Sequence, residues 1–336
     1  MRAYAKINLA LSVGPPLTQG PAAGYHPIAS WFHTIDLFDD VTVEPLPSGS
    51  ADHYDVRWTP SAPVRSLVDW PLDQDLAVRA HRLIQEHTGR RLPVALTLVK
   101  RIPVGAGLGG GSSDAAATLQ LINYTFNLNL SQAELLRLSR RLGSDVAYFL
   151  DDPPPRPAIV TGAGEHVERL ERTAAHLVLI LPEFRCPTAA VYGAFDRLAA
   201  EVGAPNGGPA GQRGEHTVGA ATATAPPAAS ARAAAATSAP PTSPGAPREP
   251  DIRTLARAGW VESRALFNDL TPAAHAVEPR LAELHRKVRE ASGLPVHLTG
   301  TGSALFIPCA EEPEARRLAA SLAPGLDAAV VRTRLV

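Results

Sequence analysis

The segment IPVGAGLGGGSSDAAATLQ, residues 102–120, places five glycines within seven positions and then continues into an alanine-rich stretch. The preceding residues 94–100, VALTLVK, are typical of a strand. Ser112, Ser113 and Asp114 offer N-caps for a following helix that carries apolar residues on one face. The sequence therefore predicts a strand, a glycine loop and a helix in direct succession.

A glycine loop that opens onto a helix N-terminus is suited to bind an anion. The first helical N–H groups lack partners, and the helix dipole places partial positive charge beside them. Without side chains, phosphate oxygens approach the backbone closely. A flexible linker is the alternative, but linkers seldom separate a strand from a capped helix. Phosphate binding is the better interpretation.

Three known phosphate-binding motifs fit this loop poorly. GAGLGG (105–110) matches the letters of the dinucleotide fingerprint, but the next acidic residue after Asp114 is Glu134, which lies at a new helix start. Residues 101–103 also separate the strand from the first glycine, and no Gly-Lys-Ser/Thr of a Walker loop follows. The protein-kinase signatures are missing as well.

Two other segments carry candidate polar residues. AYAKINLALSV (3–13) alternates as a half-buried strand does, so that Lys6 and Asn8 share one face; a solvated lysine is the simple alternative. In GSDVAYFL (143–150), Asp145 begins a short apolar segment, and an ordinary helix N-cap is the simple alternative there. A capping box at Ser131 and Glu134 predicts a helix just before it.

These segments together resemble the galactokinase, homoserine kinase, mevalonate kinase and phosphomevalonate kinase superfamily, the GHMP kinases. The glycine loop is similar to its phosphate loop, and LTGTGSALF (298–306) to its C-terminal glycine motif. The resemblance is strongest to the branch that phosphorylates a cytidine-diphosphate derivative of methylerythritol in the non-mevalonate isoprenoid pathway. It rests on AKINLAL (5–11), AAGYHPI (22–28), KRIPVGAGLGGGSSDAA (100–116), GSDVAYF (143–149) and FNDL (267–270).

The resemblance implies a role for each of these segments. Lys6 and Asp145 would be the catalytic pair, with ATP and Mg²⁺ as cofactors. The residues implied to bind the nucleotide are Lys100, Pro103, Val104, Gly105, Ala106, Gly107, Leu108, Gly109, Gly110, Gly111, Ser112 and Ser113. Those implied to bind the cytidine and erythritol parts of the substrate, or to lie beside them, are Asn8, Tyr25, His26, Thr188, Tyr192, Gly300, Thr301 and Gly302.

Some of these residues also have ordinary explanations. Tyr192 is equally well explained as a helix core residue, and Tyr25 and His26 as turn residues after Gly24. Asp75 stands where the family commonly has asparagine; an ionised carboxylate cannot donate a hydrogen bond to adenine. Ala147 replaces a usual proline, which affects the local turn more than the chemistry.

The predicted elements indicate an α+β fold. Helices are predicted at 74–88 and 311–323, and strands at 41–45, 54–58, 158–162, 176–182, 296–300 and 328–335. The resemblance implies a ribosomal-S5-like N-terminal lobe and a ferredoxin-like C-terminal lobe. We expect these lobes to be residues 1–165 and 166–336.

An insertion is expected at about residues 204–250. From 219 to 247 every residue except Arg232 is Gly, Ala, Pro, Ser or Thr, and no large apolar residue occurs between Val218 and Ile252. Such a segment has nothing to bury and predicts disorder. The family has a much shorter connection here, and a neutral insertion is favoured over a docking role.

Net charge, cysteine spacing and the length of apolar runs limit which class of protein this chain can be. The chain has 336 residues with a net charge of −1, which gives no reason to expect a nucleic acid or membrane partner. Cys186 and Cys309 lie far apart and indicate reduced thiols, and no metal-site spacing is found. The longest apolar run, LVLIL (177–181), is too short to span a bilayer. We expect a cytoplasmic protein that acts on a small molecule.

Other functions stay open at this point. A related kinase acting on homoserine or a mevalonate-type alcohol is the first alternative, although GYH (24–26) and FNDL favour the cytidyl substrate. A non-catalytic nucleotide-binding protein of the same fold is a second, but it would need neither Lys6 nor Asp145. A nicotinamide dehydrogenase is the weakest of these alternatives, because the glycine loop fits the dinucleotide fingerprint poorly.

Overall fold

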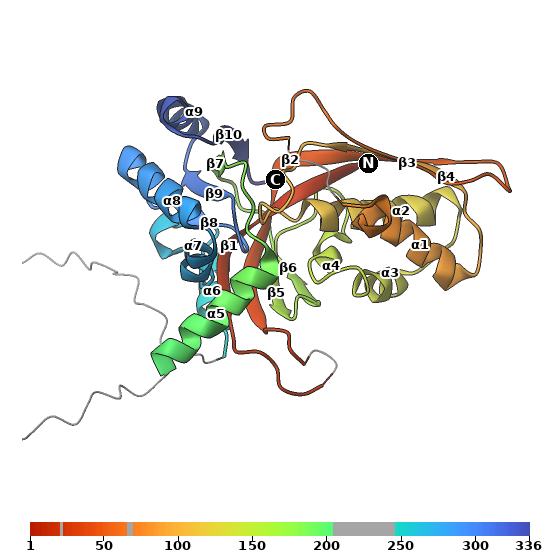
Figure 1. Cartoon of the computed structure of the whole chain (residues 1–336), viewed down its shortest axis with the longest axis horizontal. Coiled ribbons are helices and arrows are strands. Elements are labelled where there is room, and N and C mark those ends of the chain that lie inside the picture. Colours follow the sequence, from red (N-terminus) through yellow and green to blue (C-terminus); the bar gives the residue numbers. More distant parts are fainter. Residues whose placement is uncertain (21–22, 66–69, 204–245) are drawn as a thin grey trace, which may run out of the picture.

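The structure, a computed structural model, describes residues 1–20, 23–65, 70–203 and 246–336. Its first sheet has the strand order β3-β4-β2-β5-β6, and β1 pairs with β2 (Figure 1). The pairs are antiparallel except for β3 with β4. The strands are β1 (Arg2–Val13), β2 (Ile28–Pro45), β3 (His53–Trp58), β4 (Val94–Lys100), β5 (Ala158–Gly162) and β6 (His166–Arg169).

Helices α1 to α4 gather at one end of the molecule against this sheet (Figure 1). Their buried side chains form an apolar core with β2 and β5 that includes Phe32, Ile84, Leu119 and Val160. The elements are the 3-10 turn η1 (Leu72–Gln74), α1 (Leu76–Thr88), α2 (Gly110–Thr125), α3 (Gln132–Ser139) and α4 (Val146–Phe149).

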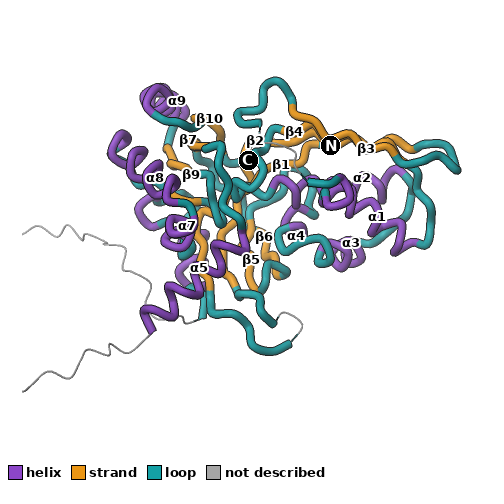
Figure 2. The backbone as a smooth tube through the Cα atoms, in the orientation of Figure 1, coloured by secondary structure: helices purple, strands orange, loops and turns teal. Residues whose placement is uncertain are grey.

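The second sheet has the antiparallel order β10-β7-β9-β8, with α7, α8 and α9 at the opposite end of the molecule (Figure 2). Its strands are β7 (His176–Leu181), β8 (His297–Leu298), β9 (Leu305–Cys309) and β10 (Ala329–Arg334). The helical elements are α5 (Thr188–Gly203), α6 (Glu249–Arg257), η2 (Ser263–Ala265), α7 (Thr271–Val277), α8 (Pro279–Ser292), α9 (Glu312–Leu322) and η3 (Ala323–Gly325).

The two sheets share one hydrophobic core. Ile7 and Leu9 of β1 belong to the same cluster of buried residues as Leu177 and Leu179 of β7. The chain ends also meet β2, because the Val336 N–H donates to Thr34 O (3.1 Å) and the Val41 N–H to Met1 O (2.9 Å). The β1 backbone is therefore fixed between the first sheet and the second.

Most predicted elements are confirmed, with altered ends. The strands at 3–13 and 94–100, the helix at 311–323 and the capping box at Ser131 all form. The strand expected at 41–45 is the end of the much longer β2, whose earlier residues pair with β1 and β5. The strand at 296–300 shortens to His297–Leu298, because the chain turns into the glycine motif there.

The half-buried character predicted for residues 3–13 is wrong. Every residue of β1 after Arg2 is buried, including Lys6 and Asn8. The apolar face packs into the core shared by both sheets, and the glycine loop covers the Lys6 side chain on the other face, since Lys6 Nζ donates to Gly107 O (3.1 Å). Lys6 is therefore not a solvated surface lysine.

The predicted start of α2 is wrong as well. The N-cap is Gly109 (φ +71°), and Ser112, Ser113 and Asp114 lie within the first turns of the helix. The left-handed backbone of Gly109 reverses the chain sharply, so the helix begins before the serines. No side chain caps this helix end, which leaves its first amides facing the loop.

Most of the predicted insertion lies outside the described residues. The chain is described again from residue 246, and α6 begins at Glu249. The first sheet extends to Arg169 of β6 and the second begins at His176 of β7; the division into lobes at residue 165 stays a prediction. Within the described ranges, no helix combines the length and apolar character needed to cross a membrane.

Candidate active site

The glycine loop lies directly against the C-terminal glycine motif. Gly107 has φ +76°, and a Cβ atom there would lie 2.2 Å from Thr299 O. The Ala304 N–H donates to Ala106 O (3.1 Å), and Thr299 Oγ1 donates to Gly107 O (3.4 Å). Only glycine fits this approach of two backbones. Two segments almost 200 positions apart thus form one surface above β1.

Lys6 reaches from β1 to this surface. Its Nζ donates to Asn8 Oδ1 (2.8 Å) and to Gly107 O (3.1 Å), and it lies 3.4 Å from Asp145 Oδ2. The Nζ is also 4.7 Å from the centroid of the Phe32 ring. The ammonium is buried, but Asp145 keeps 28% of its side chain exposed. The predicted catalytic pair therefore meets at the glycine loop.

Asp145 occupies the N-cap position of α4, yet its side chain makes no capping hydrogen bond. The carboxylate faces Lys6 instead. A helix of only four residues gains little from a dipole interaction with it. The ordinary explanation for this aspartate, helix capping, is thus not what the geometry indicates, and its catalytic role stays a prediction.

The orientation of Asn8 is fixed by its partners. Nδ2 donates to Ser30 Oγ (2.8 Å), and Ser30 Oγ donates to Ala10 O (2.6 Å). The backbone N–H of Asn8 donates to Thr299 Oγ1 (3.0 Å). This assignment leaves Oδ1 to accept from Lys6. Ser30 and Thr299 were not singled out from the sequence; Thr299 lies inside the quoted glycine motif, and Ser30 had no local signal.

A second predicted group joins the segment before β2 to α5. The ring centroids of His26 and Tyr192 are 5.0 Å apart at 32°, and Phe195 meets His26 edge-on at 5.8 Å. Asp196 Oδ1 lies 3.4 Å from His26 Nε2. Burial raises the pKa of Tyr192 to about 12, and the negative charge of Asp145 adds to this shift. The His26 group therefore lies within electrostatic reach of Asp145.

The remaining predicted substrate residues lie at the edges of this region. Thr188 Oγ1 is 3.3 Å from Thr301 Oγ1, which joins the start of α5 to the glycine motif. Tyr25 is exposed. Asp196, which sequence reasoning missed, follows Tyr192 by four residues on the same helix face, and this spacing could have revealed it. Arg185, also missed, places its side-chain carbons over Gly105.

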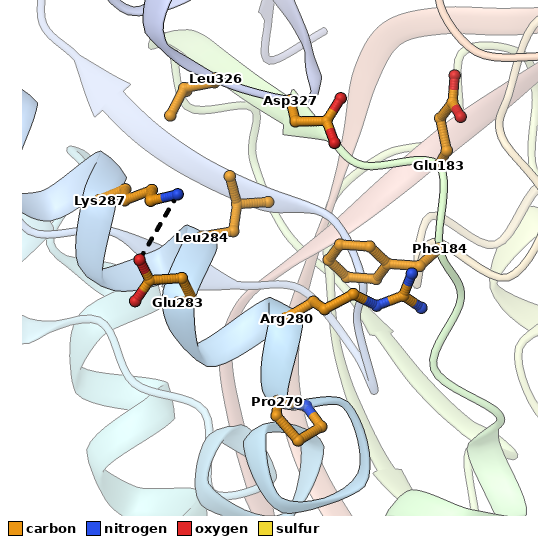
Figure 3. Close-up of a pocket in the computed structure, with 9 residues that line it drawn as sticks. All are labelled: Glu183, Phe184, Pro279, Arg280, Glu283, Leu284, Lys287, Leu326 and Asp327. Atoms are coloured by element: carbon orange, nitrogen blue, oxygen red, sulfur yellow. Dashed lines mark ion pairs between the residues drawn. The ribbon is translucent and has the colours of Figure 1, made fainter.

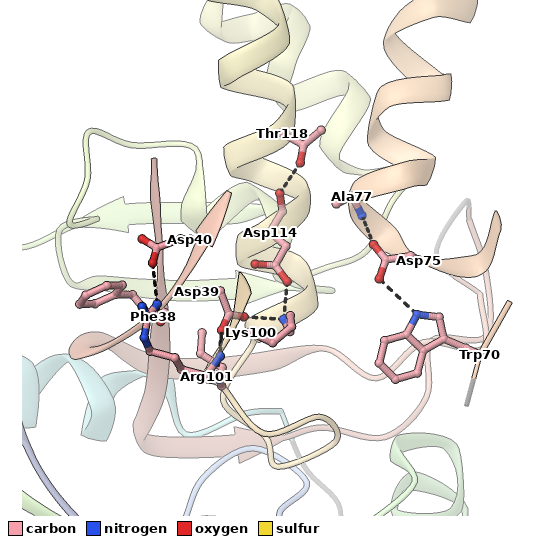
Figure 4. Close-up of polar contacts among 11 residues, drawn as sticks. Phe38, Asp39, Asp40, Trp70, Asp75, Ala77, Lys100, Arg101, Asp114 and Thr118 are labelled. Carbon is pink, nitrogen blue, oxygen red and sulfur yellow. Dashed lines mark hydrogen bonds and ion pairs between the residues drawn. The ribbon is translucent and has the colours of Figure 1, made fainter. Parts of the chain in front are cut away.

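Lys100, unlike the other residues predicted to bind the nucleotide, has a charged side chain that is paired inside the protein. Its ammonium is buried and forms ion pairs with Asp39 and Asp114 (Figure 4). Burial disfavours the charge on Lys100, but the two carboxylates outweigh it and raise its pKa. A direct contact between Lys100 and the nucleotide stays a prediction.

Asp75 is occupied by local contacts. Its Oδ1 accepts from the Ala77 N–H (2.9 Å) as the N-cap of α1, and its Oδ2 accepts from Trp70 Nε1 (3.1 Å) (Figure 4). Each carboxylate oxygen thus has a partner within the chain. These bonds fix the start of α1 beside α2.

A cavity of about 510 Å³ lies between α8 and the segment after β7 (Figure 3). Its basic side chains are already paired: Lys287 Nζ lies 3.5 Å from Glu283 Oε1, and Arg280 binds Glu278. The lining residues are Glu183, Phe184, Pro279, Arg280, Glu283, Leu284, Lys287, Leu326 and Asp327. This mix of paired charges does not match a phosphate site.

Known proteins match this chain along most of its length. Residues 75–152 match the family model described as the GHMP kinases N-terminal domain. A protein from Mycolicibacterium smegmatis, 4-diphosphocytidyl-2-C-methyl-D-erythritol kinase, is 31% identical over 321 residues, which cover 94% of this chain and 83% of the relative. The relative of the same name from Chlorobium phaeobacteroides is 36% identical over 91% of this chain and 87% of its own length.

A further relative of that name, from Paraburkholderia phymatum, is 38% identical over 56% of this chain; the aligned part spans 59% of that relative, less than two thirds of its length.

Solved structures agree in fold. A crystal structure of 4-(cytidine 5'-diphospho)-2C-methyl-D-erythritol kinase superposes with a TM-score of 0.65 at 29% identity, covering 100% of this chain and 98% of the other. Methanococcus jannaschii mevalonate kinase, at 11% identity and a TM-score of 0.60, covers 100% of this chain and 98% of its own and shares the fold alone. The predicted α+β GHMP fold is confirmed. The chain belongs to the 4-diphosphocytidyl-2-C-methyl-D-erythritol kinase family of GHMP kinases.

Proposed function

We propose that this protein transfers the γ-phosphoryl group of ATP to the 2-hydroxyl of 4-diphosphocytidyl-2-C-methyl-D-erythritol. The observation that carries the proposal is the meeting of Lys6, Asp145 and Gly107: the ammonium lies 3.4 Å from the carboxylate and donates to the loop carbonyl at 3.1 Å. A cation, a base and an anion-binding loop are the parts that phosphoryl transfer to an alcohol requires.

The roles follow from charge and position. The amides from Gly105 to Ser113, at the uncapped start of α2, bind the nucleotide phosphates. Asp145 accepts the proton of the 2-hydroxyl as its oxygen bonds to the γ-phosphorus and the bond to the ADP oxygen breaks. Lys6 offsets the negative charge that develops on the transferred group.

Mg²⁺ is expected to accompany ATP. In kinases Mg²⁺ binds mainly to phosphate oxygens and water, with only one or two protein carboxylates. The described residues contain no group of three or more His, Cys, Asp or Glu side chains arranged to hold a metal; a nucleotide-borne ion does not need one. Bound Mg²⁺ would neutralise part of the phosphate charge.

The cytidine part is assigned to the group around His26. Tyr192 and Phe195 offer aromatic surface, and His26 offers a polar ring. A site that forms hydrogen bonds to a polar edge discriminates strongly, because a wrong ligand leaves buried groups unpaired.

The test is ADP release from ATP and Mg²⁺ with three acceptors: the cytidyl substrate, homoserine and mevalonate. We expect turnover with the cytidyl substrate alone. Turnover with homoserine or mevalonate would instead assign the chain to a sister activity. ATP binding without turnover of any acceptor would indicate a non-catalytic nucleotide-binding protein.

A further inference from the structure

Three buried charges lie beneath the glycine loop: Asp39, Lys100 and Asp114, here named the ion triad (Figure 4). Lys100 Nζ donates to Asp39 Oδ2 and to Asp114 Oδ2. None of the three side chains is more than 5% exposed. The proposed chemistry at Lys6 and Asp145 makes no use of them.

Each member of the ion triad belongs to a different element at the base of the loop. Asp39 lies in β2, and its Oδ1 accepts from the backbone N–H groups of Arg101 and Ile102, where the loop begins. Asp114 lies in the first turns of α2, where the loop ends. Lys100 is the last residue of β4 and joins the two. The ion triad thus ties the entrance of the loop to its exit.

The balance of charge in the ion triad depends on Lys100. Burial raises the pKa of Asp114, although Lys100 opposes this shift, and the carboxylates of Asp39 and Asp75 add to it. Asp114 Oδ1 is buried and has no hydrogen-bond partner among the described residues. Without the ammonium, two buried carboxylates would face each other uncompensated, which is strongly unfavourable.

We propose that Lys100 is a positioning residue for the nucleotide phosphates: it acts through Asp39 and Asp114 on the backbone of the glycine loop and does not contact the nucleotide itself. This inference rests on the proposed ATP-dependent function. It explains why a lysine next to a phosphate-binding loop is turned into the protein and held by two acids.

Lys100→Met tests the proposal through ATP binding measured by calorimetry and through kinetics with the cytidyl substrate. Misplacement of the loop by about 1 Å costs on the order of 10²-fold. We therefore expect kcat/KM for ATP in Lys100→Met to fall by about that factor, the ATP Kd to rise, and the KM of the acceptor to change little. The matched control is Lys287→Met on α8, whose exposed ammonium pairs with Glu283. ATP binding equal to that of the unmodified chain would overturn the proposal.

A variant of Asp114 distinguishes an indirect effect of Lys100 on the nucleotide from a direct contact. Asp114→Asn keeps the Lys100–Asp39 pair and removes the negative charge that holds Lys100 to α2; we expect the ATP Kd to rise, but by less than in Lys100→Met. The double variant Lys100→Met with Asp114→Asn relieves the repulsion between the two acids but leaves buried Asp39 without its ammonium partner, so its ATP Kd should fall between those of Asp114→Asn and Lys100→Met. A direct phosphate contact by Lys100 predicts the reverse, with the double variant at least as weak as Lys100→Met.

If Lys100→Met does not fold, the test of the positioning role rests on Asp114→Asn alone. Unchanged ATP binding by Asp114→Asn would then overturn the proposal. The unmodified chain tests the proposed function separately. If it neither binds ATP nor phosphorylates an acceptor, the proposed function fails. If it does both and the variants bind ATP as it does, only the role of Lys100 fails.

Discussion

At the scale of single residues, His26 has an oxygen atom beside each ring nitrogen. Nδ1 lies 2.8 Å from Gly14 O, and since a carbonyl only accepts, Nδ1 carries a proton. Nε2 faces Asp196 Oδ1 at 3.4 Å. The Nδ1 bond to Gly14 thus holds the ring in one orientation against Tyr192.

We predict that His26→Ala raises the KM of the cytidyl substrate roughly tenfold or more, because a lost hydrogen bond at a buried site costs about 1–3 kcal/mol. The KM of ATP should stay nearly constant. Initial rates at varied concentrations of each substrate measure both constants. His166→Ala is the matched control, since this exposed histidine lies on β6 beside Glu165. Equal changes in both KM values would place His26 outside the cytidine pocket.

At the scale of elements, histidines join α7, α8 and β8. His285 Nε2 donates to Val296 O (2.9 Å), which leaves its Nδ1 to accept from His275 Nε2 (3.1 Å). Burial, with a contribution from His275, lowers the pKa of His285 to about 4. Burial likewise lowers the pKa of His297 to about 4.

These shifts predict lower stability in acid. Above pH 6.5 the histidines are neutral in both the folded and the unfolded state. Between pH 6.5 and about 4 only the unfolded state binds the protons, so the free energy of unfolding falls as pH falls, by up to about 3 kcal/mol per histidine. Urea unfolding at pH 7.5 and 5.0 measures this loss. His285→Gln keeps a hydrogen-bond donor for Val296 O and should reduce the loss of stability between pH 7.5 and 5.0. His87→Gln, at the exposed end of α1, should leave that loss unchanged. An equal pH dependence in both variants would contradict the account.

Local signals in the sequence account for many element ends but not for the site. The capping box at Ser131 lies within four residues, and the structure has it as predicted. Whether Lys6 and Asn8 are solvated depends on Gly107 and Thr299, which are about 100 and 290 positions away. The role of Lys100 depends on Asp39 in another strand. Such contacts leave no local pattern, so only the match of whole motifs to a family indicated them.

At the scale of the whole molecule, the chain re-enters the described structure at a fixed anchor. Arg248 Nη2 donates to Asp269 Oδ1 (2.6 Å), and the Arg248 N–H donates to Ser12 Oγ (3.0 Å). The guanidinium also lies 3.7 Å from the centroid of the Phe267 ring. Asp269 Oδ2 in turn accepts from Ser12 Oγ and from the Val13 N–H. This anchor holds the end of β1 next to Gly14, the partner of His26.

Two deletions test the anchor. Removal of residues 207–245 takes away a segment whose composition offers no large apolar residue beyond Val218, so thermal unfolding should stay cooperative and both KM values should hold. Removal of 207–248 also deletes Arg248 and should raise the KM of the cytidyl substrate severalfold, since His26 loses its support. Identical behaviour of the two deletions would show that Arg248 does not matter. Loss of cooperative unfolding in the shorter deletion would make the segment structural.

The central claim is that Lys6 and Asp145 act as one unit in phosphoryl transfer, and a double-variant cycle on turnover tests it most directly. Asp145→Asn keeps size but removes the base, so kcat should fall by about 10²–10⁴ while ATP affinity and thermal stability hold. Lys6→Met should behave similarly. In the double variant kcat should fall far less than the product of the two single effects, because the effects of groups that act together are not additive. If Asp145→Asn instead unfolds the protein while its folded fraction turns over normally, Asp145 is only structural and the claim is wrong.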